Sequence, residues 1–253
     1  MKISIITHSF NQGKFIEKNI KSILDQNYPN FEHIIVECGS TDDTVEILKK
    51  YSHLKWVSEA DEGQADALNK GLKMATGEII GWLNSDDYYL PNAFNIVSET
   101  YLNGKWDWLI GNLKYYYKSK NEFIEVISPD LTYDKLIVNP DIVCQQSTFF
   151  SKTTLLKVGG WKKEYQMIMD YELWLRLIKL SQPKIVNEFL AVFVWHEEQK
   201  SMPLNIIVQK KEFLKLLKKE KVNLFIRIKI SLKKNRIFVI AFLKQLVNRI
   251  ISK

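Results

Sequence analysis

The chain has few cysteines and no recognisable export signal. Cys38 and Cys144 are the only cysteines among 253 residues, too few for a disulfide framework, and their spacing matches no zinc signature. The opening MKISIITHSF holds one lysine and too short an apolar run for a signal peptide. We therefore expect a protein of a reducing compartment, whose first residues form a buried strand.

Most of the chain has no net positive charge, and the basic excess lies at its end. Residues 203–253 contain 14 Lys and Arg against 2 Asp and Glu, a net of +12, although the whole chain carries only +7. Residues 1–202 hold 22 basic and 27 acidic residues, a net of −5. With 46% hydrophobic residues, the sequence predicts an acidic globular body with an ample core, followed by a basic tail.

Short apolar runs alternate with helical periodicity over the first hundred residues. This alternation predicts parallel strands joined by helical crossovers, a Rossmann-like α/β sheet that binds ligands beyond the carboxyl ends of its strands. The predicted strands are 3–7, 33–38, 55–59 and 78–84, and the predicted helices are 15–24, 65–75 and the segment around Val45, capped by Ser40 or Thr41.

The pattern changes after residue 100 to that of an α+β half, which would cover one side of the nucleotide-binding half. The expected elements are strands at 107–112, 145–151 and 184–195, a hairpin over 115–127 that turns at Lys118 to Asn121, and a helix over 170–180.

The segment GWLNSDDYYLP places Asp86 and Asp87 side by side directly after an apolar run. Adjacent carboxylates repel each other, so a solvated turn or a bound cation must favour their charged forms. A polar turn that caps a helix starting near Pro91 or Asn92 explains the pair equally well. The dipeptide alone leaves both interpretations open.

Four stretches in order, from about residue 2 to about residue 200, resemble the family 2 glycosyltransferases with the GT-A fold. They are SIITHSFNQGKFIEKNIKSILDQNYPNFEHIIVECGSTDDTVEILKKY, DEGQADALNKGLKMATGEIIGWLNSDDYYLP, QQSTFFSKTTLLKVGGW and MDYELWLRL. The resemblance implies a GT-A domain over 1–202, with a nucleotide-sugar-binding half at 1–102 and an acceptor-side half at 103–202.

The resemblance also implies a reaction. It implies an inverting transferase that moves a sugar from a nucleotide-sugar donor, expected to be a UDP-sugar, to a hydroxyl of a glycan or lipid-linked glycan. The expected setting is the assembly of a bacterial capsule, O-antigen, exopolysaccharide or glycoprotein glycan.

In this family a divalent cation, Mn²⁺ or Mg²⁺, bridges the donor diphosphate to an Asp-x-Asp-like motif, onto which Asp86 and Asp87 fall. We expect Asp87 as the direct ligand and Asp86 directed toward the ribose or the metal, since these ions take carboxylate and phosphate oxygens. His196 matches a position that supplies a further metal or diphosphate ligand in some members, and a structural histidine is the alternative.

The resemblance assigns further residues to the donor side. Phe10 matches an aromatic position that can stack on the nucleobase, with a core residue at the end of a strand as the alternative, and Thr7 and His8 lie on the adjacent loop. Glu37 stands where the family commonly has Asp, in ECGS instead of the usual DDGS or DGGS, which leaves the nucleobase open. Asp66 matches another donor-side position, with a solvated helix residue as the alternative.

On the acceptor side, Asp170 in MDYELW matches the family's catalytic base. Inversion requires a carboxylate that removes the acceptor proton while the oxygen attacks the anomeric carbon. A carboxylate that interacts with a helix dipole is the alternative, and Glu172 is a poorer candidate. Trp161 is expected either as an apolar platform for a sugar ring or as a core residue.

The basic tail at 203–253 reads as amphipathic helices, because it has no uncharged apolar run long enough to span a bilayer. We expect it to hold the protein at the cytoplasmic face of the cell membrane by contact with anionic lipid, with packing on the protein as the alternative.

Two other functions compete with sugar transfer. A nucleic-acid-binding protein could use the basic tail, but the acidic body has no recognition motif, so we expect no nucleic acid partner. A sugar nucleotidyltransferase would need a glycine-rich loop after the first strand, where the only glycine is Gly13.

Overall fold

The computed structural model describes residues 1–196 and 206–223, and the chain divides into two units, Met1–Glu197 and Glu198–Lys253. The strands of the first unit are β1 (Ile3–Ser9), β2 (Phe31–Glu37), β3 (Leu54–Ser58), β4 (Ile79–Trp82), β5 (Tyr88–Tyr89), β6 (Trp108–Tyr117), β7 (Glu122–Val126), β8 (Thr148–Ser151) and β9 (Lys184–Trp195). Its helices are α1 (Ile16–Leu24), α2 (Thr44–Lys49), α3 (Gln64–Met74), α4 (Ala93–Asn103), α5 (Tyr133–Val138), α6 (Lys152–Lys157), α7 (Met169–Leu180) and the 3-10 helix η1 (Gln145–Ser147).

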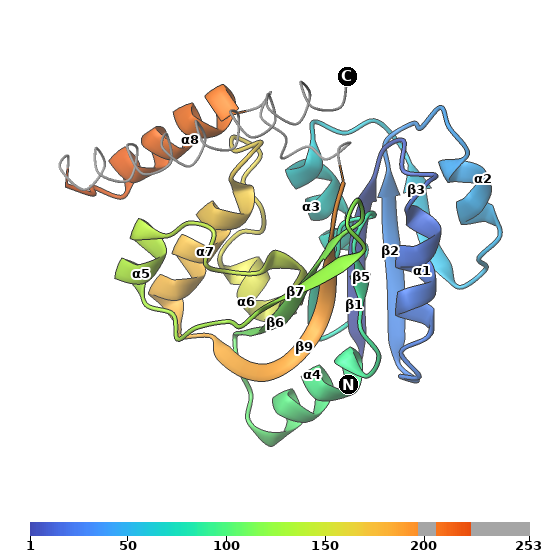
Figure 1. Ribbon diagram of the computed structural model, residues 1–253, viewed down its shortest axis with the longest axis horizontal. Helices are drawn as coiled ribbons and strands as arrows, with labels where there is room; N and C mark the ends of the chain where they lie inside the picture. The colour runs from blue at the N-terminus through green and yellow to red at the C-terminus, as the bar shows by residue number, and fades with distance from the viewer. Residues whose placement is uncertain (197–205, 224–253) are drawn as a thin grey trace. The chain divides into compact units, whose positions relative to one another are not determined.

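A single sheet runs through the first unit in the order β3-β2-β1-β4-β8-β6-β9-β5, and β7 pairs with β6 (Figure 1). The first four strands in this order are parallel to one another, as predicted. Their connections contain α1, α2 and α3, because parallel neighbours require crossovers. This half therefore has the α/β architecture that the sequence predicts.

The expectation of a mostly parallel sheet is wrong beyond β4. The pairs β4–β8, β8–β6, β6–β7 and β5–β9 are antiparallel, and only β6–β9 is parallel. Strand β8 lies between β4 and β6, so a segment some 65 residues beyond β4 returns beside it. The sheet is therefore mixed, with a parallel core, and it joins both halves of the first unit.

Helices cover both faces of the parallel strands. Ile16 and Ile20 of α1 pack in one cluster with Ile35 of β2, on one face. On the opposite face α3 approaches β1 closely: a Cβ atom added at Gly71 would come 2.4 Å from Cγ2 of Ile6. A larger residue at this position would push α3 away from the sheet.

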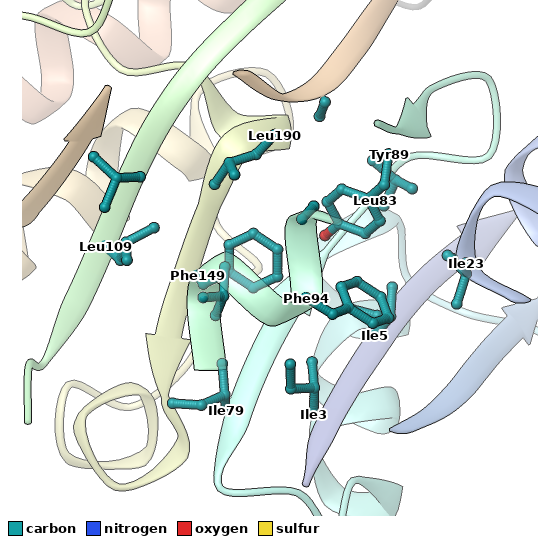
Figure 2. Packing of buried hydrophobic residues seen from close by; sticks show 14 of the residues in the cluster. Ile3, Ile5, Ile23, Ile79, Leu83, Tyr89, Phe94, Leu109, Phe149 and Leu190 are labelled. Carbon is teal, nitrogen blue, oxygen red and sulfur yellow. The ribbon is translucent and has the colours of Figure 1, made fainter. Parts of the chain in front are cut away.

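One hydrophobic core cluster joins the two halves of the sheet. Figure 2 shows Ile3 of β1, Ile79 of β4 and Phe149 of β8 converging with Phe94 of α4 and Leu190 of β9. All five side chains are fully buried. Each contributes about 1.5–3 kcal/mol by burial, so this cluster holds β4 in place between β1 and β8.

Two local predictions are corrected by the structure. Strand 145–151 begins only at Thr148, because the preceding residues form η1. Ser40 and Thr41 do not cap α2, which begins after Asp43. Both residues form hydrogen bonds with Asn11 instead. The N–H of Asn11 donates to Ser40 Oγ (2.8 Å), and the N–H of Thr41 donates to Oδ1 of Asn11 (2.9 Å). These bonds join the loops that follow β1 and β2.

The described part of the second unit is α8 (Ile206–Lys219) with the residues up to 223. Phe213, Leu216 and Leu217 are buried, whereas Lys211 and Lys218 are exposed, as in an amphipathic helix. The remainder of the predicted basic tail lies outside the described residues. Over the ranges that the structure covers, every helix is too short or too polar to cross a bilayer.

Candidate active site

Three loops leave the same edge of the parallel strands. Ser9 at the end of β1 pairs with Glu37 at the end of β2, which pairs with Ser58 at the end of β3. The chain leaves β4 at Trp82 and reaches Asp86 four residues later. The two aspartates therefore lie where open parallel sheets bind ligands.

Asp87 is enclosed by the protein, with 1% of its surface exposed. The N–H of Val194 donates to Oδ1 (3.0 Å), and the side-chain amides of Gln146 (2.9 Å) and Asn84 (3.2 Å) donate to Oδ2. Burial raises the pKa of this carboxyl well above its usual range, and the charge of Asp86 raises it further. Both oxygens face protein donors, so the geometry gives Asp87 a positioning role in place of the direct metal ligation that we expected.

Asp86 is paired with His196, which lies 110 residues further along the chain. Asp86 Oδ2 and His196 Nε2 are 3.0 Å apart, and the two side chains keep 18% and 8% of their surface exposed. The imidazole stacks on Phe15, with the ring centroids 4.2 Å apart. The structure thus brings these two predicted residues together. The helix expected near Pro91 or Asn92 is present as α4, but its N-cap residue is Asn92, so neither aspartate caps it.

The Asp86–His196 pair fits a divalent cation that is shared with a bound ligand. Mg²⁺ commonly takes one or two carboxylates from a protein and completes its coordination with water and phosphate oxygens, and carboxylates also suit Mn²⁺. Within residues 1–196 and 206–223, no group of three or more His, Cys, Asp or Glu side chains is placed to enclose a metal. A cation held here would therefore depend on phosphate oxygens for the rest of its coordination.

Asn84 is a site residue that sequence reasoning did not identify. Its Oδ1 accepts hydrogen bonds from the Trp82 indole (3.1 Å) and the Gln64 amide (3.3 Å). Its Nδ2 donates to Asp87 (3.2 Å) and to Gln145 (3.2 Å). Asn84 thus links β4, α3 and η1. The signal was available, because this polar residue follows the same buried strand as the aspartates.

The adjacent glutamines of QQS were also overlooked. Gln145 donates to the carbonyl of Trp82 (2.6 Å), and Gln146 donates to Asp87. Both are buried, and buried amides require partners. Two neighbouring amides before an apolar run are therefore a signal for a buried polar network.

Glu37 organises its own loop instead of facing a ligand. It is fully buried and accepts hydrogen bonds from the N–H groups of Gly39 (3.0 Å) and Ser40 (2.5 Å) and from the Ser58 hydroxyl. Burial raises the pKa of Glu37, but these hydrogen bonds outweigh it and lower the pKa. Gly39 has φ +71°, which favours glycine. The expected contact between the Glu37 carboxylate and a nucleotide is therefore corrected.

The predicted donor-side residues of β1 and its loop differ in accessibility. Thr7 is fully buried, and its Oγ1 lies 3.0 Å from Nε2 of His33. Its side chain is therefore turned into the protein and is not placed for the donor contact that we expected. His8 is half-buried, with Nδ1 3.5 Å from the amide of Gln64. Phe10 is 55% exposed, which leaves its ring accessible for the predicted stacking.

Asp66 joins α3 to the loop before α7. Its carboxylate is 2.5 Å from Nζ of Lys163 and 3.5 Å from Nζ of Lys70, and it accepts a hydrogen bond from the N–H of Glu62 (3.2 Å). The hydrogen bond from Lys163 is the main reason why the pKa of Asp66 is lowered. The donor-side role predicted for Asp66 competes with these ion pairs.

Trp161 lies in the core, with 2% of its surface exposed. Its ring packs edge-on against Trp82, with centroids 5.6 Å apart, and against Phe150, at 6.3 Å. Of the two roles expected for Trp161, the structure thus supports the core residue and not the platform for a sugar ring.

Asp170 and Glu172 lie in the first turn of α7 but have different surroundings. Asp170 is half-buried, and its Oδ1 accepts a hydrogen bond from the N–H of Tyr171 (2.7 Å). Glu172 is buried and forms an ion pair with Arg176 (2.6 Å), which also donates to the carbonyl of Gly160 (2.8 Å). Glu172 therefore fixes α7 to the preceding loop, and Asp170 is the more accessible carboxylate.

The start of α7 is tied to the same edge of the sheet. Gln166 Nε2 donates to the carbonyl of Glu62 (3.4 Å), just before α3. The first residue of α3, Gln64, reaches Asn84 beside the aspartates. Loops from β4, α3 and α7 are thus linked in one region.

Residues 4–160 match a protein family described as Glycosyl transferase family 2. The match covers more than half of the chain. This chain belongs to glycosyl transferase family 2. The family is an inverting family of glycosyltransferases, which identifies the chain as an enzyme of that kind.

Family 2 relatives align with most of the first unit. The Escherichia coli protein WfgD, described as UDP-Glc:alpha-D-GlcNAc-diphosphoundecaprenol beta-1,3-glucosyltransferase, is 30% identical over 190 residues, which cover 73% of this chain and 73% of WfgD. An uncharacterized glycosyltransferase of Mycobacterium tuberculosis (strain H37Rv) is 27% identical over 196 residues, which cover 76% of this chain and 74% of the relative.

Solved structures of this fold show the same architecture at lower identity. Residues 1–349 of Staphylococcus aureus TarS in complex with UDP-GlcNAc superpose with a TM-score of 0.70 at 19% identity, covering 86% of this chain and 64% of that one. The mannosyltransferase PcManGT from Pyrobaculum calidifontis, in complex with GDP-Man and Mn²⁺, gives 0.59 at 17% identity, covering 87% and 64%. The chain thus spans less than two thirds of these solved chains.

Proposed function

We propose that this family 2 enzyme transfers a sugar, with inversion, from a UDP-sugar to a hydroxyl of a lipid-linked glycan during bacterial surface-glycan assembly. The observation that carries the proposal is the Asp86–His196 pair at the carboxyl edge of the parallel strands. The substrates in the description of WfgD and the UDP-GlcNAc in the TarS complex support the choice of donor and acceptor.

Three side chains divide the chemistry. Asp86 and His196 would hold Mn²⁺ or Mg²⁺, which neutralises charge on a diphosphate leaving group when bound. Asp170 takes the proton from the acceptor hydroxyl while that oxygen attacks the anomeric carbon, and the bond to the diphosphate breaks on the opposite side. The result is one glycosidic bond of inverted configuration and one nucleoside diphosphate.

The remaining contacts keep these groups in place. Asp87 anchors the aspartate loop to β9 through the N–H of Val194, so Asp86 and the end of β9 keep a fixed separation. Asn84 and Gln146 bind the other oxygen of the same carboxylate. A rigid network of this kind preorganises the site before substrate binds.

The test is a panel of nucleotide sugars incubated with the full chain, Mn²⁺ or Mg²⁺ and lipid-linked acceptors, scored by the release of nucleoside diphosphate. We expect release from a UDP-sugar that requires both metal and acceptor, and an anomeric proton signal that shows inversion. Asp86→Asn is the matched variant with the same shape and no charge. Release that is independent of metal, or undiminished in Asp86→Asn, would contradict the proposal.

We further propose that the basic residues 203–253 hold the enzyme peripherally at the cytoplasmic face of the membrane, where a lipid-linked acceptor lies. The charge of this segment, a net of +12, supports the proposal, since each Lys or Arg near an anionic surface contributes about 1 kcal/mol.

A further inference from the structure

Lys18 on α1 is held over two tyrosine rings close to the aspartate loop. Its Nζ lies 3.6 Å from the ring centroid of Tyr88 and 5.8 Å from that of Tyr116. Tyr88 directly follows the two aspartates in the chain. Because an ammonium group is attracted to the face of an aromatic ring, these contacts fix its position.

Lys118 approaches the same place from the turn after β6. Its Nζ lies 5.4 Å from the ring centroid of Phe15, and the other ring on Phe15 is that of His196. Phe15 therefore connects Lys118 with the histidine that meets Asp86. Two ammonium groups from distant segments thus flank the Asp86–His196 pair.

The two lysines have no compensating negative charge in the described part of the chain. Lys21 of α1 pairs with Glu17, and Lys114 of β6 pairs with Glu125, but neither Lys18 nor Lys118 forms an ion pair there. Burial lowers the pKa of Lys18, and the charge of Lys118 lowers it further. Both side chains are exposed, so water screens their mutual repulsion, and an anion bound between them would relieve what remains.

A diphosphate bound at the site would supply such an anion, because its negative charge exceeds the positive charge beside it. One carboxylate and one divalent cation together carry a net charge of +1, whereas a nucleotide-sugar diphosphate carries about two negative charges, and more charge develops on it as the sugar departs. The same excess of negative charge exists on a diphosphate that links a glycan to a lipid. Phosphate oxygens beside the Asp86–His196 pair therefore need additional positive charges from the protein.

We propose that Lys18 and Lys118 form a phosphate-binding site adjacent to the Asp86–His196 pair, which takes a diphosphate of either the donor or the lipid-linked acceptor. This inference rests on the proposed function. Lys18 acts from α1 and Lys118 from the β6–β7 turn, so the site spans both halves of the sheet.

The test measures binding in the full chain carrying Lys18→Gln and Lys118→Gln together. Titration calorimetry with UDP reports the donor diphosphate, and titration with decyl diphosphate reports the acceptor diphosphate, each with and without Mn²⁺. We expect the affinity for one of these probes to fall about tenfold, since removing two positioned charges costs on the order of 1.4 kcal/mol. The weakened probe identifies the source, and the difference shrinks as salt is raised.

The control variant is Lys50→Gln with Lys120→Gln, which removes the same charge from exposed positions just after α2 and on the β6–β7 turn. Lys18→Arg with Lys118→Arg keeps the charge and is expected to restore affinity. Equal affinities of the Gln pair and the control pair for both probes overturn the inference. Failure of the proposed function is a separate result, namely a wild-type chain that releases no nucleoside diphosphate from any donor.

Discussion

At the scale of single residues, burial separates two adjacent aspartates that look equivalent in the sequence. Asp87 accepts three hydrogen bonds in a closed environment, whereas Asp86 keeps 18% of its side chain exposed beside His196. One carboxylate therefore holds the loop, and the other stays accessible. Sequence reasoning found the pair but assigned direct ligation to Asp87, because it could not see that this side chain is the enclosed one.

Asp87→Ala is expected to lower the free energy of unfolding by about 2–4 kcal/mol, because it leaves the Val194 N–H and two amides without an acceptor. Asp86→Ala serves as the control and should stay within about 0.5 kcal/mol of the wild type. Urea unfolding followed by circular dichroism measures both. Equal stabilities of the two variants would show that Asp87 has no positioning role.

The first turn of α7 offers a second matched pair. Asp170→Asn is expected to lower kcat at least about a hundredfold, since it removes the group that accepts the acceptor proton, with little change in stability. Glu172→Gln should instead weaken the ion pair with Arg176 and lower the melting temperature while most of kcat remains. Steady-state kinetics and thermal unfolding of both variants check this. A near-normal kcat in Asp170→Asn would show that Asp170 is not the base.

At the scale of elements, local patterns predicted the parallel half better than the mixed half. Local periodicity reveals the alternation of strands and helices up to β4, and this alternation implies helical crossovers between parallel strands. The pairing of Gly81 in β4 with Phe149 in β8 is different, because it joins residues far apart in the chain and no local signal encodes it. Similarly, η1 looked like strand because its polar network with Asn84 depends on tertiary contacts.

Strand β2 carries a buried histidine that makes stability depend on pH. Burial lowers the pKa of His33 to about 3 from 6.5, with a further contribution from the charge of His53. The folded chain keeps His33 neutral, so below pH 6.5 the unfolded chain binds a proton that the folded chain does not. The stability that His33 contributes is therefore present above pH 6.5 and lost as the pH falls toward 3.

His33→Gln, which can still bond Thr7, is expected to reduce this loss. Between pH 6.5 and 5.0 the free energy of unfolding of the wild type should fall by about 1.5–2 kcal/mol more than that of the variant. Urea unfolding at the two pH values measures the difference. Other groups that titrate in this window, such as His53 and Asp87, are present in both proteins, so their effects cancel in the difference. Identical pH slopes in the two proteins would refute the assignment.

At the scale of the whole molecule, charge separates an acidic body from a basic end, and the proposed membrane contact follows from that separation. Deletion of 204–253 is expected to abolish sedimentation with anionic vesicles, because this segment is strongly basic whereas residues 1–202 carry a net charge of −5. Neutral vesicles are the control, together with donor hydrolysis to show that the shortened chain remains folded. Undiminished sedimentation of the shortened chain would place the contact elsewhere.

The site also depends on the whole molecule, because Asp86 and His196 lie 110 positions apart and meet only when β9 returns beside β5. The resemblance of short motifs identified both residues, but their distance of 3.0 Å required the complete sheet.

The central claim is that Asp86 and His196 hold the divalent cation that a donor diphosphate shares. A crystal of the full chain grown with Mn²⁺ and UDP tests it most directly, through the anomalous signal of manganese. The account predicts one peak within bonding distance of Asp86 Oδ2 and His196 Nε2 that also contacts both phosphates. A manganese peak bound to UDP but away from these two side chains would contradict it.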